Sequence, residues 1–220
     1  GESDRFDRQS ALLKSTRDIT AELDVTVRTR ALVEPDIGAA IVDVVTEASA
    51  DQVLMGWNGK LARGRHVFGS TLDSVLRRSP TDVSLVEIQS ETIGAPVALA
   101  GPGPHTPVAV RRVAEFATVD ETTPTLLNVQ PPADDADPVA RGMETIRGAA
   151  ERADLDPEAY DAEVIVDDDI ESAILDAVDG YDTVCTGLSE KKGIQFGSIA
   201  ERISQRIDGN VAVVRGVDDE

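Results

Sequence analysis

Cysteine and histidine are almost absent from this chain of 220 residues. A single cysteine, Cys185, excludes an internal disulfide, and the two histidines, His66 and His105, provide no ligand set at metal spacing. Because Cys185 lies in the apolar run Thr183-Val-Cys-Thr, we expect a small buried core residue and not a nucleophile. Both histidines lie in predicted loops without obvious partners, and no Ser/His/Asp or Cys/His arrangement is visible, so we expect no enzymatic activity.

Long apolar runs are also missing. No run approaches the roughly 18 to 20 residues that a membrane span requires, and no signal-peptide pattern opens the sequence. With 41% apolar residues the chain can still bury a core. We therefore expect a soluble, cytoplasmic protein that does not insert into a membrane by itself.

Positive charge is scarce as well. The chain has 41 acidic and 21 basic residues, a formal charge of -20, and only four lysines. A face basic enough to bind phosphate backbones is not expected, which argues against nucleic acid as a partner. Few aromatics and an Ala/Val-rich core complete a composition typical of a salt-loving cytoplasm, where a Debye length of about 3 Å in molar salt screens the self-repulsion.

The sequence contains an internal repeat. Residues 51–56 match 182–187, each a short apolar strand that ends in glycine, and residues 82–86 match 210–214. Gly69-Ser70 also matches Gly197-Ser198, and Arg78 matches Arg206. The chain therefore consists of two related units.

A helix with the same apolar spacing precedes the first strand of each matching pair. The apolar positions in 37–45 and 170–178 both follow i, i+3, i+4, i+7, i+8. Asp36 and Asp169 stand where a helix N-cap belongs.

The second unit predicts one complete α/β domain. Strands are expected at 96–100, 125–129 and 162–166, helices at 108–117 and 138–153, and then helix, strand, helix, strand. Strands that alternate with helices predict parallel crossovers and a sheet with helices on both faces.

The first unit is shorter. It begins with a predicted helix over 5–23 and a predicted strand over 25–33, and compared with the second unit it lacks a strand, a helix and a strand, or roughly 40 residues. We expect an incomplete domain over 1–90 and a complete one over 94–220. The polar stretches 89–94 and 131–137 are expected to be solvated connectors.

A glycine-rich loop follows the strand that ends at residue 56. Gly56-Trp-Asn-Gly59 is followed by nine residues and then by Gly69-Ser-Thr71 at the start of a predicted helix. Glycines allow close approach to an anion, and backbone N–H groups and hydroxyls at a helix N-terminus can bind it. The alternative is a tight turn that binds no anion. Three of the four lysines lie in the two equivalent loops, which favours an anion site.

On this Gly-x2-Gly-x9-Gly-Ser/Thr signature the chain resembles the universal stress protein family. The resemblance implies two doubly wound parallel sheets in three α/β/α layers, the adenine nucleotide alpha hydrolase-like fold, with the first copy lacking its N-terminal strand-helix-strand. It also implies that the loop wraps the ribose and phosphates of a nucleotide, with ATP or AMP as candidates. The candidate binding residues are Gly56, Gly59, Gly69, Ser70, Thr71, Gly187, Gly197 and Ser198.

Two departures from the family pattern concern the ligand. In the second loop Glu190 replaces a glycine, and Gly197 follows after only six more residues. If Gly187 is instead the second glycine, the nine-residue spacing is restored, but Val184 then occupies the first glycine position. The family's nucleotide binders carry an aspartate at the end of the first strand, where this chain has Ala100, and the first unit has no first strand. We therefore expect neither unit to carry the family's full adenine site.

The pair Gly56-Trp57 resembles stress-protein-type tails of archaeal amino acid, polyamine and organocation transporters. That resemblance implies a cytoplasmic regulatory or sensor module of an amino acid or cation permease. The alternative is a free-standing universal stress protein that binds ATP or AMP. Trp57 could equally be an interface or loop-packing residue.

The strand, helix and strand that the first unit lacks must be supplied by another segment of polypeptide. The related folds imply a strand order of 3-2-1-4-5, so the missing strands would lie between 25–33 and 53–55. We expect them to come from residues upstream of Gly1, in a longer transporter polypeptide, or from a second copy in a homodimer. The end strands 83–86 and 211–214 are candidates for pairing between units.

Overall fold

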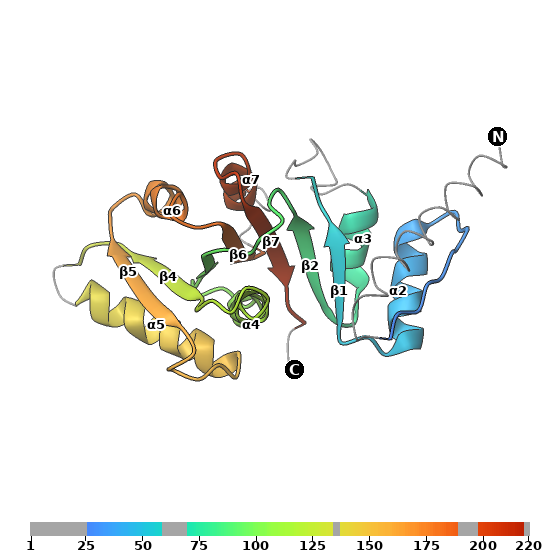
Figure 1. Ribbon diagram of the computed structural model, residues 1–220, viewed down its shortest axis with the longest axis horizontal. Helices are drawn as coiled ribbons and strands as arrows, with labels where there is room; N and C mark the ends of the chain where they lie inside the picture. The colour runs from blue at the N-terminus through green and yellow to red at the C-terminus, as the bar shows by residue number, and fades with distance from the viewer. Residues whose placement is uncertain (1–25, 59–69, 134–136, 189–197, 218–220) are drawn as a thin grey trace.

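The computed structural model describes residues 26–58, 70–133, 137–188 and 198–217. Helices and strands alternate along these ranges (Figure 1). In chain order they are α2 (Ile37–Ala48), β1 (Gln52–Gly56), α3 (Ser70–Arg78), β2 (Asp82–Glu87), β3 (Pro96–Leu99), α4 (Thr106–Ala117), β4 (Thr125–Gln130), α5 (Pro138–Arg152), β5 (Asp161–Val166), α6 (Ile170–Val178), β6 (Thr183–Gly187), α7 (Ser198–Ser204) and β7 (Asn210–Arg215).

The seven strands form one sheet in the order β1-β2-β7-β6-β3-β4-β5. All neighbours are parallel except β2 and β7, which pair antiparallel and join the two units. This confirms the predicted pairing between the end strands of the two units. The second unit has the doubly wound order, and the described residues of the first unit contribute β1 and β2 to the sheet (Figure 1).

Helices cover the two faces of the sheet unequally. One apolar core, with residues from α2, α3, α6 and α7, runs along the sheet from β1 to β4 and across the β2–β7 joint. The opposite core comprises α4, α5 and strands of the second unit, and Val86 of β2 only borders it. The three-layer α/β/α class is thus confirmed. On the second face of β1, the Gln52 side chain accepts a hydrogen bond from Arg112 of α4, whereas Leu54 is 58% exposed.

The two units have the same strand register. β1 pairs with β2 from Gln52 opposite Asp82 to Gly56 opposite Val86, and β6 pairs with β7 at the matching positions. The predicted N-caps are also confirmed, because the Asp36 and Asp169 side chains accept hydrogen bonds from the backbone N–H groups three residues later, at 2.9 and 3.0 Å.

The predicted strand over 25–33 is wrong for the described residues 26–33, which form no strand and are mostly exposed. A strand at this position would need the neighbouring strand of a complete unit, because strand-forming residues are stable in a strand only when the strand pairs with another. The segment instead contacts α2, where the Arg30 guanidinium bonds to the Glu47 carboxylate at 2.6 Å. The predicted helix over 5–23 lies outside the described residues.

The connector over 89–94 is fixed to the second unit. Asn210 at the start of β7 accepts hydrogen bonds from the backbone N–H groups of Gln89 and Ser90, at 3.0 and 3.1 Å. Its amide group donates to the Thr92 carbonyl at 2.9 Å. These bonds hold the connector between β2 and β3 against the start of β7. Among the described residues, no helix is long and apolar enough to cross a membrane.

Candidate functional site

The first glycine loop leaves the sheet at the carboxyl end of β1. Gly56 ends the strand, and a Cβ added there would meet no described atom within 4 Å. Trp57 continues the pairing, because its N–H donates to the Val86 carbonyl at 2.7 Å. Its side chain is only 6% exposed and belongs to the core, so Trp57 is a packing residue and Gly56 is the open position.

Helix α3 begins at the same end of the sheet (Figure 1). Ser70 is its first residue and is exposed, and Thr71 is partly exposed. Backbone N–H groups in this first turn can receive an anion. Asp73 in the same turn is buried and places a carboxylate close to the positive end of the helix dipole. An anion at Ser70 and Thr71 would therefore share this helix end with a negative charge.

The matching place in the second unit is closed. A Cβ on Gly187 would lie 3.1 Å from the carbonyl carbon of His105, at the start of α4. His105 is 3% exposed, and its Nδ1 accepts a hydrogen bond from the Gly216 N–H at 3.2 Å. His105 thus has a structural partner 111 residues away, which the expectation of an unpartnered loop histidine missed. The two units differ in that Gly56 is open and Gly187 is packed.

The end of β3 carries no carboxylate. Ala100, where the family's nucleotide binders have aspartate, is fully buried, and its N–H donates to the Leu127 carbonyl at 2.7 Å. Its carbonyl accepts from the Asn128 side chain at 2.5 Å, and Gln130 donates to the Asn128 Oδ1 at 2.7 Å. Sequence reasoning missed this amide pair, although Asn128 interrupts an otherwise apolar strand.

Several predicted site residues lie outside the described residues. These are Gly59, Gly69 and Gly197, together with the basic residues of both loops. Ser198 is described only as the first residue of α7. The structure therefore places Gly56, Ser70 and Thr71 at one end of the first unit and Gly187 beside α4 in the second.

Within the described ranges, no three His, Cys, Asp or Glu side chains are grouped so that they could hold a metal ion. Cys185 is fully buried as expected, and this burial raises the pKa of its thiol far above the usual range. A thiol that stays protonated and enclosed is a poor nucleophile.

Comparisons with protein families and solved structures agree with the α/β fold described above. The family model described as universal stress protein family matches residues 2–87. No curated protein matches the chain in sequence.

Solved structures share the fold. A universal stress protein from Archaeoglobus fulgidus is 17% identical with a TM-score of 0.66, over 99% of this chain and 80% of that one. One from Pseudomonas aeruginosa, titled a putative universal stress protein, is 15% identical with a TM-score of 0.59, over 93% and 77%. A second Archaeoglobus fulgidus protein, solved in complex with dAMP, is 18% identical with a TM-score of 0.42, over 56% and 100%. The family match thus covers residues 2–87, less than half of the chain, and the solved universal stress proteins show that the chain shares their fold.

Proposed function

We propose that the chain is a cytoplasmic, non-catalytic regulatory module that binds a nucleotide or another anion at its first unit and reports to a membrane transporter. The proposal that the first unit binds an anion rests on the difference between Gly56 and Gly187. Gly56 is open beside the N-terminus of α3, whereas Gly187 packs against His105. Among the described residues, Gly56 leaves room for a phosphate to approach the backbone and Gly187 does not.

The transporter part has its support in the sequence pair Gly56-Trp57 and in the incomplete first unit. The described sheet ends at β1, so this unit has a free edge at which a larger assembly can attach. The substrate of such a transporter is not part of the proposal.

A second candidate function is a free-standing universal stress protein that binds ATP or AMP. The likeness to the Archaeoglobus fulgidus universal stress protein over 99% of this chain favours it. Crosslinking in native membranes separates the two candidates. Recovery of a crosslinked permease supports the regulatory module, and recovery of the chain in the soluble fraction alone supports the free-standing protein.

The binding site is tested by calorimetric titration of ATP and AMP in about molar KCl, which screens the acidic surface. Gly56→Val should abolish saturable binding, because the added side chain occupies the open position without touching a described atom. Gly69→Val, in the second half of the glycine-rich sequence motif, should also abolish saturable binding. Gly101→Val is the matched control after β3, since a Cβ there also meets nothing within 4 Å. Binding that survives Gly56→Val, or its absence in the unaltered chain, would overturn the proposal.

A further inference from the structure

Equivalent positions of the two units differ sharply in exposure. Leu54 of β1 and Cys185 of β6 match in the repeat, yet Leu54 is 58% exposed and Cys185 is fully buried. In the second unit β3 pairs with β6, and α4 packs on β3, β6 and β7. Among the described residues, nothing takes the places of β3 and α4 beside β1. The second unit thus shows what covers such a strand when the unit is complete.

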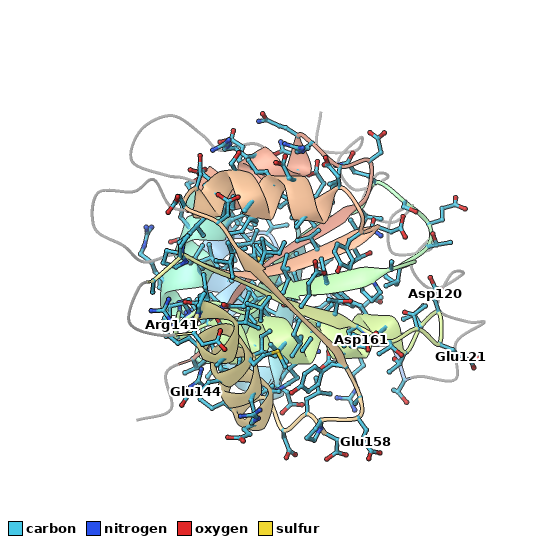
Figure 2. All side chains as sticks on the ribbon, turned by 90° about the vertical axis from the view of Figure 1, so that its left-hand side faces the viewer. Asp120, Glu121, Arg141, Glu144, Glu158 and Asp161 are labelled. Atoms are coloured by element: carbon cyan, nitrogen blue, oxygen red, sulfur yellow. The ribbon has the colours of Figure 1, made fainter. Side chains whose placement is uncertain are left out.

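The two outer edges of the sheet are also built differently. β5 carries Asp161 and Glu163, both exposed, and Figure 2 shows Asp161 among further acidic side chains at that end of the molecule. Charged residues of this kind protect an edge strand from pairing with another chain. β1, with the sequence Gln52-Val-Leu-Met-Gly56, has no charged residue. The β5 edge is suited to solvent, and the β1 edge is suited to a partner strand.

Backbone direction supports the same conclusion. Trp57 donates its N–H toward β2, and backbone groups of successive residues in a strand alternate between its two sides. Gln52, Leu54 and Gly56 therefore turn their N–H and C=O groups away from β2. In the second unit, Thr183, which matches Gln52, donates to the Ala95 carbonyl just before β3. The free edge of β1 thus offers the hydrogen bonds of a parallel strand.

We propose that the free edge of β1 and the uncovered face at Leu54 form a docking surface for a strand-helix segment of polypeptide outside residues 1–220. The strand pairs in parallel with β1, and the helix lies over Leu54 and Val86. The segment has the chemistry of β3 and α4, with small apolar residues such as the buried Val97 and Ala98 in the strand. This inference names the contact through which the proposed module reaches its partner, and it does not depend on nucleotide binding.

A peptide of residues 95–118, which contains β3 and α4, is a direct probe of this surface. Labelled peptide added to the intact chain in about molar KCl should give a saturable rise in fluorescence anisotropy. Leu54→Lys should weaken this binding about tenfold or more, because an edge lysine opposes strand addition. The matched control is Val119→Lys. It places the same charge on a residue that is 69% exposed and that lies just after α4 in the second unit, not on β1. Absence of binding, or equal binding to both variants, would overturn the inference.

Hydrogen exchange and sedimentation test the same surface without relying on a variant. The Leu54 and Gly56 amides should exchange fast in the chain alone and slow when the peptide is bound. Protection in the monomeric chain alone would contradict the inference, because a segment of this chain would then already cover the edge. A dimer that Leu54→Lys dissociates would also overturn it and would assign the edge to a second copy.

Discussion

Leu85 of β2 lies opposite Val213 of β7 in the antiparallel register that joins the two units, and neither side chain is more than 1% exposed. Truncating Leu85 to alanine leaves a cavity at the joint. We expect Leu85→Ala to lower the free energy of unfolding by about 2–5 kcal/mol, measured by urea denaturation. Leu54→Ala, at an exposed position, should change it by no more than about 0.5 kcal/mol. Similar losses in both variants would show that the joint is not a packed core.

Two glycines of α5 provide a matched pair for packing against the sheet. A Cβ on Gly142 would lie 2.4 Å from the Val164 Cγ1, whereas a Cβ on Gly148 meets nothing within 4 Å. Gly142→Ala should therefore destabilise the protein by about 1–3 kcal/mol through overpacking. Gly148→Ala should stabilise it by about 0.5–1 kcal/mol through helix propensity. Thermal unfolding of both variants checks the pair, and a shift of the same sign in each would count against the packing described for α5.

The Arg206 guanidinium bonds to both carboxylate oxygens of Asp179, at 2.7 and 2.6 Å, and these hydrogen bonds hold the pKa of Asp179 below its ordinary value of 3.8. Because the pKa is lower in the folded than in the unfolded state, the pair contributes stability above pH 3.8, and this contribution is lost as the pH falls through the folded-state pKa. Arg206→Gln should raise the pKa of Asp179 in a carboxyl NMR titration.

The stability difference between Arg206→Gln and the unaltered protein should accordingly narrow below about pH 4. Arg78→Gln, the matching arginine of the first unit, is the control and should leave the pKa of Asp179 unchanged. An unaltered Asp179 titration in Arg206→Gln would show that the pair does not persist in solution.

The sequence repeat predicts much of the fold because the two units share the same local patterns of apolar residues and helix caps. Matching residues 51–56 with 182–187 and 82–86 with 210–214 predicts two related units, and the strand pairs β1–β2 and β6–β7 have the same register. The caps at Asp36 and Asp169 follow from side-chain chemistry within one helical turn. The pairing of β2 with β7 could also be proposed, since both strands end their units.

What the sequence could not predict depends on contacts between distant residues. Residues 26–33 contain the β-branched and apolar residues typical of a strand, but a strand forms only beside a partner. His105 looks like a loop residue until Gly216, at the end of β7, is placed beside it. The difference between Gly56 and Gly187 likewise depends on α4, which only one unit has. For these reasons the sequence could not predict that Gly56 is open and that Gly187 is packed against His105.

The charge of -20 makes the stability of this fold depend on salt. Repulsion among the acidic side chains destabilises the compact state, and raising KCl from about 0.1 M to 1 M shortens the Debye length from about 10 Å to about 3 Å. We expect the urea midpoint to rise over this range. The control is the double variant Glu144→Lys and Glu158→Lys, which changes two exposed acidic residues labelled in Figure 2.

Each of these two substitutions removes one negative charge and adds one positive charge, so the net charge changes from -20 to about -16. The double variant should be more stable than the unaltered protein at low salt, and its midpoint should rise less steeply with KCl. Equal slopes would mean that KCl acts through general solvent effects on burial and not through screening. A flat dependence in both proteins would contradict the adaptation to high salt that the composition predicts, because the acidic surface would then not destabilise the fold in dilute buffer.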